Sequence, residues 1–301
     1  MPKILVTGSA GQVGHFLVDA LNRQKNDFFG IDIKNPTKFN YQFVKVDLRN
    51  LKDIKKHKDQ LYEFDVLIHL AGLNDNEPNV IKNGLKSLDY NIKTTLNLLE
   101  FLPRLKQICF ASTYMVYGIP ISNPVKETHP TEPFYVYAVC KLINEKFLQV
   151  YSKKQNIDLT ILRFMGIYGT ESPIERLAIP LFIKKIVNNE IPTIFGTGKL
   201  KRNSIYIDDV VEAILTSIRK RKSGIFNIGG EDSASPLEYI DLINNELGKN
   251  IKPVFIKKTG TKYDFITDIS KAKKELGFKP RVNIREGISR TIKTYYKTNK
   301  K

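Results

Sequence analysis

The sequence has few cysteines, few histidines and no long apolar run, and each shortage excludes a class of protein. Cys109 and Cys140 are the only cysteines among 301 residues. Two are too few for a disulfide framework and are typical of free thiols in a reducing compartment. No apolar run approaches the roughly 20 residues that a bilayer crossing requires. The histidines show no ligand spacing, so we expect no metal site; they are His15, His57, His69 and His129.

A secretory signal is also lacking, because Met1-Pro2-Lys3 leads directly into an apolar strand pattern without a basic start and a cleavage site. There is no internal repeat and no low-complexity segment. Hydrophobic residues make up 42% and charged residues 26% of the chain. These shares are average for globular proteins and exclude disorder, collagen and coiled coil as overall descriptions. We therefore expect a globular cytoplasmic protein that does not span a membrane.

Acidic residues are scarce relative to basic ones, and the net charge is +17. Residues 249–301 carry most of it, with 16 Lys and Arg against 4 Asp and Glu. We favour a solvated lysine-rich tail over a basic funnel for an anionic substrate, and both over a nucleic-acid or membrane surface. The earlier residues contain no basic run interleaved with aromatics, as a single-strand groove would have. We therefore expect no nucleic-acid partner.

Short apolar runs alternate with helical patterns over the first 165 residues, which is typical of an α/β fold with a parallel sheet. Each run is nearly continuous, as strands buried on both faces should be. The expected strands are Lys3–Val6, Phe28–Asp32, Gln42–Val46, Val66–Leu70, Gln107–Ala111 and Leu159–Leu162. Beyond about Gly166 loops dominate, with helices expected at Pro180–Asn188, Asp208–Lys220, Pro236–Leu247 and Ile284–Tyr296.

A glycine-rich turn follows the first expected strand and opens the first helix. Gly8, Gly11 and Gly14 have the spacing G-x-x-G-x-x-G, which lets a backbone approach a pyrophosphate at a helix N-terminus. An ordinary strand-to-helix turn would explain the glycines about as well. Asp32 ends the second strand, where a carboxylate accepts ribose hydroxyls and repels a 2′-phosphate, so the pattern favours NAD over NADP. Lys34 would soften that repulsion.

The residues that directly follow the third and fourth strands would lie beside the glycine-rich turn and line the same cofactor cleft. Asp47-Leu48 and Ala71-Gly72 lie at these positions, although each pair alone is typical of a loop.

A Tyr-x-x-x-Lys pair, which places both side chains on one helix face, occurs three times in the chain. Tyr41/Lys45 lies in a strand and Tyr296/Lys300 in the basic tail. Tyr137/Lys141 opens a helix after the fifth strand and is the candidate for catalysis.

These stretches together resemble the NAD-dependent epimerase/dehydratase family of extended short-chain dehydrogenase/reductases, over nearly the whole chain. The matching segments are TGSAGQVG, GIDIKN, VDL, HLAG, DYNIKTTLNLLE with Asn91, STYMVYG, YAVCKLINE, LRFMGIYG, FGTGKLKRNSIYIDDV, FNIGG and DISKAKKELGFKP. The resemblance implies a Rossmann-type doubly wound parallel sheet and a smaller C-terminal α/β domain that binds a nucleotide-linked sugar. It implies an NAD-binding domain over 1–167, to which 204–230 returns, and a substrate domain formed by 168–203 and 231–301.

The resemblance also implies roles for individual residues. Thr113 matches the family's residue that hydrogen-bonds the reacting oxygen, Tyr137 its proton acceptor, and Lys141 the residue that holds the ribose and keeps the tyrosine acidic. A tyrosine of ordinary pKa near 10 must lose about three units, or about 4 kcal/mol, to ionise at pH 7. The implied NAD-binding residues are Gly8, Gly11, Gln12, Val13, Gly14, Asp32, Asp47, Leu48, Leu70, Ala71, Gly72, Tyr137 and Lys141.

Substrate contacts are implied for Thr113, Arg202 and Tyr206, with the Arg202 guanidinium suited to a diphosphate. Gly166 departs from the family, which usually has a substrate-binding asparagine there. Tyr114 and Met115 follow Thr113, where related dehydratases have two acidic residues and decarboxylases a glutamate at the position of Met115.

The expected function is therefore an NAD-dependent nucleotide-sugar 4-epimerase that works through a 4-keto intermediate. A 4-ketoreductase, or a non-catalytic nucleotide-sensing or RNA-binding relative, is the alternative. The resemblance further implies a homodimer.

Overall fold

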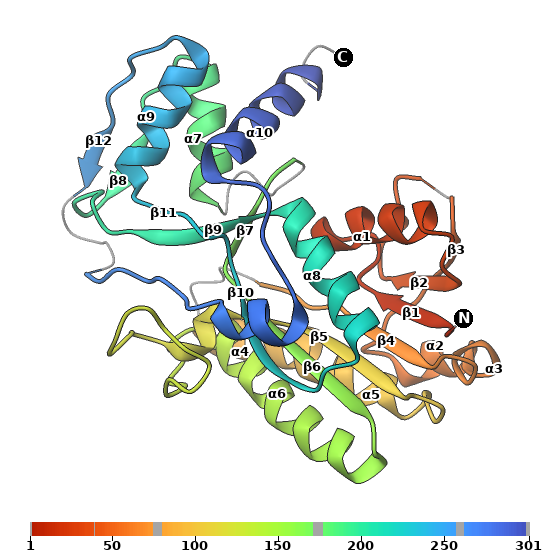
Figure 1. Cartoon of the computed structure of the whole chain (residues 1–301). Coiled ribbons are helices and arrows are strands. Elements are labelled where there is room, and N and C mark those ends of the chain that lie inside the picture. The colour runs from red at the N-terminus through yellow and green to blue at the C-terminus, as the bar shows by residue number, and fades with distance from the viewer. Residues whose placement is uncertain (1, 39, 75–79, 171–176, 257–261, 299–301) are drawn as a thin grey trace. The chain divides into compact units, whose positions relative to one another are not determined.

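A computed structural model of the chain describes residues 2–38, 40–74, 80–170, 177–256 and 262–298. The described chain divides into two compact units (Figure 1). The first consists of 1–118, 130–163 and 211–226, and the second of 119–129, 164–210 and 227–301. Of the residues that the resemblance assigns to the NAD-binding domain, 119–129, 164–167, 204–210 and 227–230 lie with the second unit, and 211–226 lie with the first.

A seven-stranded sheet forms the centre of the fold, with strand order β10-β6-β5-β4-β1-β2-β3. Its strands are β1 (Ile4–Thr7), β2 (Phe28–Asp32), β3 (Gln42–Lys45), β4 (Val66–His69), β5 (Gln107–Thr113), β6 (Asp158–Phe164) and β10 (Gly224–Ile228). The pairs β1–β2, β1–β4, β2–β3 and β4–β5 are parallel. The expected Rossmann-type doubly wound α/β class is confirmed, and all six expected strands are present. The sequence reading missed β10.

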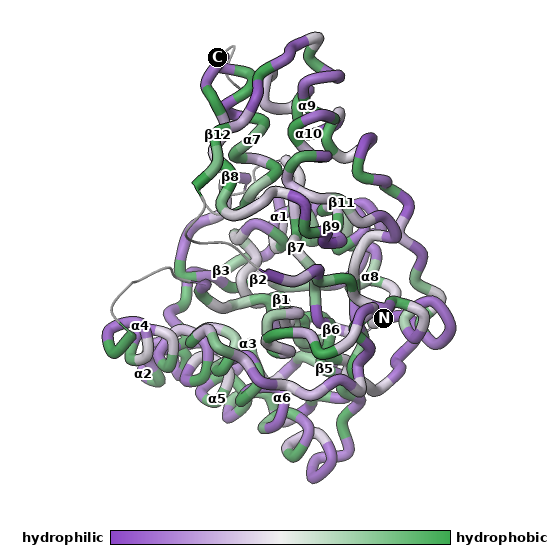
Figure 2. The backbone as a smooth tube through the Cα atoms, turned by 90° about the vertical axis from the view of Figure 1, so that its left-hand side faces the viewer, coloured by the Kyte–Doolittle hydropathy of each residue, from purple (hydrophilic) through white to green (hydrophobic). Residues whose placement is uncertain are grey.

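Helices of the first unit cover the two faces of this sheet (Figure 1). They are α1 (Gln12–Arg23), α2 (Leu51–Lys55), α3 (Lys58–Leu61), α4 (Val80–Ser87), α5 (Thr94–Leu99), α6 (Val136–Gln155) and most of α8 (Ile207–Lys220). A π-helical segment η1 (Leu88–Lys93) joins α4 to α5, and a short 3-10 helix η2 (Tyr114–Tyr117) follows β5. Hydrophobic residues (green) and hydrophilic residues (purple) alternate along these helices in Figure 2, as is typical of amphipathic helices that pack on a sheet.

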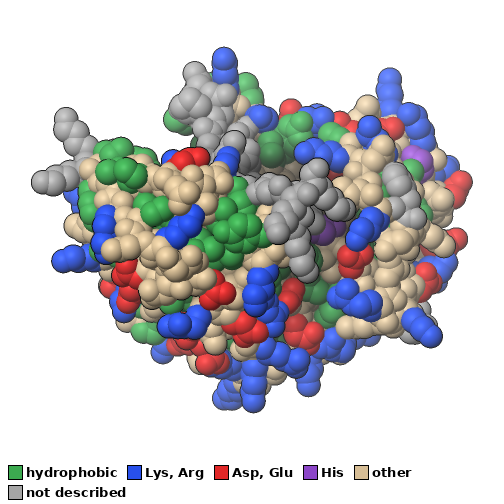
Figure 3. Space-filling model, turned by 90° about the horizontal axis from the view of Figure 1, so that it is seen from above, with side chains coloured by type: hydrophobic (Ala, Val, Ile, Leu, Met, Phe, Trp, Pro, Cys, Tyr) green, Lys and Arg blue, Asp and Glu red, His purple; other side chains and the backbone are tan. Residues whose placement is uncertain are grey.

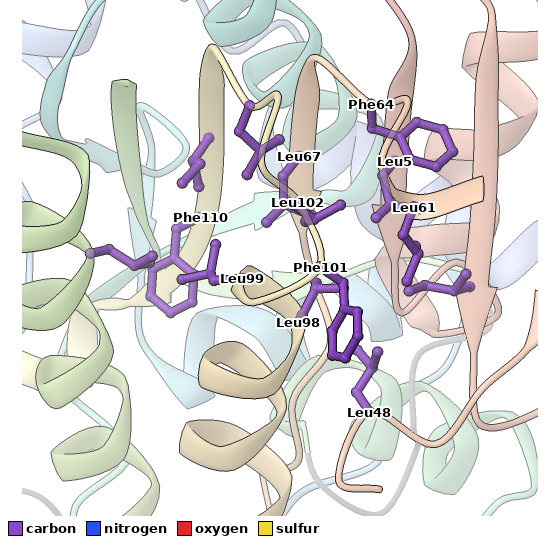
Figure 4. Packing of buried hydrophobic residues seen from close by; sticks show 14 of the residues in the cluster. Leu5, Leu48, Leu61, Phe64, Leu67, Leu98, Leu99, Phe101, Leu102 and Phe110 are labelled. Atoms are coloured by element: carbon purple, nitrogen blue, oxygen red, sulfur yellow. The ribbon is translucent and has the colours of Figure 1, made fainter. Parts of the chain in front are cut away.

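The alternation of side chains along β5 shows how the core is divided. Ile108 and Phe110 belong to the buried hydrophobic cluster that α2, α3, α5 and α6 cover (Figure 4). Cys109, which points the other way, contacts Ser217 of α8, with 3.2 Å between its Sγ and the Ser217 Oγ. Because successive strand residues face opposite sides, β5 is buried on both faces, as its sequence predicted.

β3 contradicts the expectation of full burial on both faces. Its residues Gln42 and Lys45 are exposed, and Phe43 and Val44 are only half-buried. The reason is topological, because β3 is the edge of the sheet and pairs with β2 alone. An apolar run cannot distinguish an edge strand from a central one, since neighbours are chosen by the fold.

The second unit contains two small sheets and three helices of eight residues or more that belong to it alone. Strands β7 (Gly166–Tyr168), β9 (Arg202–Tyr206) and β11 (Ser233–Ala234) form one sheet, and β8 (Thr193–Phe195) pairs with β12 (Val254–Ile256). The helices are α7 (Ala178–Val187), α9 (Pro236–Leu247) and α10 (Ile284–Thr298), with a π-helical turn η3 (Ala272–Leu276). All four helices expected after Gly166 are present within two residues of their predicted starts.

Charges and apolar side chains on one face are visible in Figure 3. Lys and Arg side chains are spread over this face and interspersed with Asp and Glu, and hydrophobic side chains gather in the left half of the view. None of the described helices is long and apolar enough to cross a membrane.

Candidate functional site

Three glycines close the turn between β1 and α1. Gly8 has a φ of +69°, in the left-handed region that favours glycine. A Cβ added at Gly14 would lie 2.0 Å from the Gly8 carbonyl oxygen, and one at Gly11 would lie 3.1 Å from the same atom. A Cβ at Gly8 would lie 2.9 Å from the backbone nitrogen of Ala71. A side chain is therefore excluded at Gly14 and crowded at Gly8 and Gly11, and the backbone is bare at these three positions of the turn.

The N-terminus of α1 opens at this turn. Gly11 caps the helix without a side-chain hydrogen bond, Gln12 and Val13 begin it, and its first turn contains no acidic residue. First-turn N–H groups have no acceptor within a helix and carry the positive end of its dipole. This end of α1 is therefore chemically suited to a diphosphate.

Asp32, the last residue of β2, contacts the same turn. Its Oδ2 accepts a hydrogen bond from the Ala10 N–H at 3.0 Å, and its Oδ1 accepts one from the Lys34 N–H at 3.0 Å. Two backbone groups thus fix the carboxylate beside the glycine turn. Each carboxylate oxygen can accept more than one hydrogen bond, so the group can still accept the hydroxyls of a ribose. The glycine turn, the α1 N-terminus and Asp32 together fit a dinucleotide.

Asp47 and Leu48 are both engaged within the protein. Arg49 lies 2.7 Å from Asp47, between Nη2 and Oδ2, and its hydrogen bonds lower the pKa of that carboxyl. The Arg49 guanidinium in turn lies 4.0 Å from the centroid of the Tyr90 ring. The Leu48 side chain is buried in the hydrophobic cluster, and its carbonyl accepts a hydrogen bond from Asn97. A role in cofactor binding stays a prediction for both.

The loop after β4 brings predicted cofactor residues close to a predicted catalytic one. The Leu70 N–H donates to the Thr7 carbonyl at 3.2 Å, and the Ala71 N–H donates to Thr7 Oγ1 at 3.1 Å. A Cβ added at Gly72 would lie 2.8 Å from Asn91 Oδ1 and 3.3 Å from Lys141 Nζ. Gly72, in the loop after β4, and the Lys141 ammonium therefore lie next to each other.

Asn91 is an organising residue that the site prediction missed. It lies in η1 and is 1% exposed. Its side chain exchanges two hydrogen bonds of 3.0 Å with the backbone of Leu73, and its carbonyl accepts one from Asn144 of α6 at 2.8 Å. The π-helical segment at this residue is a feature frequent at functional sites. The sequence signal for it was the resemblance of DYNIKTTLNLLE to the family, which includes Asn91 but was not carried over into the predicted site.

The three predicted catalytic residues lie on β5 and α6. Thr113 ends β5, is 8% exposed, and accepts a hydrogen bond from the Met115 N–H at 3.3 Å. Since a hydroxyl also donates one hydrogen bond, Thr113 can still donate to a substrate oxygen. Tyr137 and Lys141 are one turn apart in α6, with Lys141 Nζ 5.8 Å from the centroid of the Tyr137 ring. Lys141 Nζ also donates to the Ala111 carbonyl of β5 at 2.8 Å.

Burial sets the protonation of this pair. Burial raises the pKa of Tyr137. Burial also lowers the pKa of Lys141 to about 8, although the charge of Glu145 opposes the shift. At pH 7 Lys141 therefore remains mostly charged and Tyr137 remains a phenol. The predicted acidity of Tyr137 needs positive charge beyond that of Lys141, as a bound oxidised nicotinamide would provide.

Arg202 and Tyr206 lie at the two ends of β9 in the second unit. The Tyr206 ring is edge-on to Tyr168, with centroids 5.6 Å apart, and burial raises the pKa of Tyr206 to about 12. The Arg202 carbonyl lies 3.4 Å from the Tyr239 hydroxyl that donates to it. At Gly166, a Cβ would meet only Ser204 Oγ, 3.7 Å away. Among the described residues, a Cβ at this position would make only an ordinary van der Waals contact, so the absence of the family's asparagine is not forced by crowding around Gly166.

Neither cysteine has the features of a reactive thiol. Both are buried and free. Burial raises the pKa of Cys109 to about 12 and also raises that of Cys140, and a thiol is a poor nucleophile when protonated. The described residues contain no group of three or more potential metal ligands.

Comparisons with known proteins show which family the whole chain is similar to. The family model "NAD dependent epimerase/dehydratase family" matches residues 4–229. A putative UDP-glucose 4-epimerase of Methanocaldococcus jannaschii is 34% identical over 300 residues, which cover 96% of this chain and 97% of that one. The crystal structure of a Thermotoga maritima UDP-glucose 4-epimerase with UDP-glucose superposes with a TM-score of 0.90, at 27% identity and 99% coverage of both chains. A Bacillus cereus UDP-glucuronic acid 4-epimerase in complex with NAD has a TM-score of 0.85 at 28% identity, covering 98% of this chain and 99% of its own.

Proposed function

Because this chain belongs to the NAD-dependent epimerase/dehydratase family, we propose that it is an NAD-dependent 4-epimerase of UDP-linked sugars. One observation carries the proposal. Lys141, buried and mostly charged, lies against the Tyr137 ring and holds the end of the strand that delivers Thr113. Relatives named as 4-epimerases, with UDP-glucose or NAD in their crystal structures, support the substrate and the cofactor.

NAD would be held by the glycine turn, Asp32, Gly72 and Lys141, and it supplies reversible oxidation and reduction of the sugar carbon. Tyr137 takes the proton of the sugar 4-hydroxyl when that carbon is oxidised, and returns it when the carbon is reduced. Lys141 stabilises the phenolate by its charge. Thr113 donates a hydrogen bond to the same oxygen and so fixes its position relative to Tyr137. General acid–base catalysis of this kind contributes about 10² to 10⁴ in rate.

The residues after Thr113 favour epimerisation over dehydration or decarboxylation. Tyr114 and Met115 begin η2 directly after the strand. A thioether does not serve as a proton acceptor, so Met115 cannot do the work of the acidic residue that related dehydratases and decarboxylases have at its position. Epimerisation at carbon 4 needs no second acid–base pair, because the 4-keto sugar only has to turn and be reduced on its other face. Thr113, Tyr137 and Lys141 are sufficient for that.

The test is to incubate the purified protein with UDP-glucose, UDP-galactose and UDP-glucuronic acid and to follow the products by NMR. We expect interconversion of C4 epimers without net NADH consumption. Tyr137→Phe should abolish it, whereas Tyr135→Phe, two residues earlier and 51% exposed, should not. A dehydrated or decarboxylated product would refute the proposal, and stoichiometric NADH oxidation would identify a 4-ketoreductase.

We also infer a homodimer formed through α4 and α6, which pack against each other in the first unit. Ile81 and Leu85 of α4 are 73% and 64% exposed. On α6, apolar side chains at i, i+4 and i+8 are exposed: Val139, Ile143 and Phe147. A contiguous apolar face of this kind is typical of a protein interface. Light scattering should give twice the chain mass, and Ile143→Glu should give a monomer; a monomeric wild type would refute the inference. A cytoplasmic location stays a prediction of the sequence.

A further inference from the structure

A fully buried ion pair lies next to the catalytic residues, and no proposed step uses it. Arg163 of β6 donates to both carboxylate oxygens of Glu145 of α6, at 2.6 Å from Nη2 to Oε2 and 3.1 Å from Nε to Oε1. The side chains are 2% and 0% exposed. Burying two charges is costly, and apolar residues of similar volume often serve stability equally well. Stability alone is therefore a weak explanation for the pair.

The pair joins the elements that carry the catalytic groups. The Ser112 hydroxyl, one residue before Thr113, donates to Glu145 Oε1 at 2.5 Å. Glu145 is one helical turn beyond Lys141 in α6. The Arg163 guanidinium lies 4.6 Å from the centroid of the Tyr117 ring in η2. One ion pair thus connects the end of β5, η2, α6 and β6.

Glu145 also dominates the charge around Lys141. On α6, Lys141 has Tyr137, Cys140 and Glu145 as titratable neighbours. From β4, buried and neutral His69 faces it, and from β5 the Phe110 ring lies 4.7 Å away. The amide of Asn91 approaches from η1. Among the described residues in this set, Glu145 is the sole carboxylate, and its charge opposes the effect of burial on the Lys141 pKa.

We propose that Glu145 and Arg163 are positioning residues for catalysis: they lock Thr113 in register with Tyr137 and Lys141, and Glu145 provides the negative charge that faces Lys141. This inference rests on the proposed function, since it assigns the pair to the same catalytic site. Neither Glu145 nor Arg163 is proposed to contact the substrate. Their effect should therefore fall on kcat and on pH dependence rather than on KM.

Two single variants separate this role from a purely structural one. Glu145→Gln leaves an uncompensated positive charge on Arg163, so Lys141 should lose its proton at lower pH. In the pH profile of kcat, the fall on the alkaline side (the alkaline limb) should therefore move about one pH unit lower. Arg163→Met leaves an uncompensated negative charge, and the same limb should move toward alkali. In both variants kcat should fall about 10- to 100-fold through misplacement of Thr113, with KM unchanged.

The double variant Glu145→Gln/Arg163→Met guards against misfolding, because it leaves no unpaired buried charge. It should retain the fold and bound NAD, lose turnover about 10- to 100-fold, and restore the alkaline limb close to its wild-type position. As a matched control, Glu212→Gln and Arg219→Met break an ion pair of the same 2.6 Å length that is half-exposed on α8. These controls should change neither turnover nor pH profile.

A wild-type turnover in the double variant, or shifts of the same sign in both single variants, would overturn the inference. A second measurement, which does not depend on epimerase activity, distinguishes failure of this inference from failure of the proposed function. If the wild type epimerises no UDP-sugar, the pH titration of Lys141 can still be followed by NMR of ¹³C-labelled lysine in the NAD-loaded protein, assigned by loss of the signal in Lys141→Met. Opposite shifts of that titration in Glu145→Gln and Arg163→Met would support the electrostatic part of the inference, and unchanged titrations would refute it.

Discussion

Acidification should destabilise this protein through one buried histidine, His69, the last residue of β4. Its imidazole is 1% exposed. Nε2 lies 2.9 Å from Thr95 Oγ1 and Nδ1 lies 2.7 Å from Thr7 Oγ1. The single proton of the Thr95 hydroxyl is donated to the Asn91 carbonyl, so Thr95 can only accept from His69. Nε2 therefore carries the proton, and Nδ1 accepts from Thr7.

Protonation of Nδ1 would remove that acceptor and place a charge in the core. Burial, together with the charge of Lys141, lowers the pKa of His69 from 6.5 to about 3. The unfolded chain then binds more protons than the folded one between these two values, so stability falls as pH falls through this window. At about 1.4 kcal/mol per pKa unit, the loss is on the order of 4 kcal/mol by pH 3. That is a large share of the roughly 5 to 15 kcal/mol that stabilises a typical domain.

Urea unfolding followed by circular dichroism at pH 7, 5 and 4 measures this loss. His69→Gln, which can still donate to Thr95 and accept from Thr7, should be less stable at pH 7 by about 1 to 3 kcal/mol but should show a flatter pH dependence. His57→Gln, at the half-buried N-cap of α3, is the matched control and should follow the wild type. Parallel pH curves for the wild type and His69→Gln would refute the reasoning.

Three further predictions concern the cofactor site, the base and the basic tail. Gly14→Ala places a Cβ 2.0 Å from a carbonyl oxygen, so it should abolish NAD binding measured by calorimetry and cost at least about 1 to 3 kcal/mol of stability. The control Gly84→Ala, which has no described atom within 4 Å of the added Cβ, should stabilise the protein by up to about 1 kcal/mol. Equal effects of the two variants would contradict the packing argument. Tyr137→Phe should lower kcat by about 10² to 10⁴ while NAD binding is kept; near wild-type turnover would end the assignment of the base. Nucleic acid should bind weakly and dissociate steeply as salt rises, as measured by fluorescence anisotropy; submicromolar, sequence-selective binding at physiological salt would show that the tail recognises nucleic acid.

Local sequence patterns were enough to predict the parts of the site that depend on short-range geometry. The glycine spacing after the first strand predicted a tight backbone turn at the start of a helix, because backbone conformation is decided within a few residues. The interval between Tyr137 and Lys141 predicted one helix face for the same reason. Periodicity located α9 with its observed bounds, Pro236–Leu247, because an apolar pattern of helical period depends only on neighbouring residues.

Contacts between distant segments were not predictable in this way. Nothing in the spacing of Asp47 and Arg49 showed that the arginine would occupy the carboxylate and lie on Tyr90. The edge position of β3 and the return of β10 to the sheet depend on which strands become neighbours. Sequence alternation records which residues avoid water, and it does not record the partner that covers them.

The ion pair shows the division most clearly. The sequence by itself determined the apolar run Leu159–Leu162 and predicted it as a buried strand. The structure extends this strand to Asp158–Phe164 and so buries Arg163, which then requires a partner because an unpaired buried charge is prohibitively costly. Tertiary structure alone decided that the partner is Glu145, and that Ser112 shares its carboxylate. The physical reason is that a local pattern fixes what a side chain requires, whereas only the packing of α6 on the adjacent strands β5 and β6 brings these three side chains within hydrogen-bonding distance.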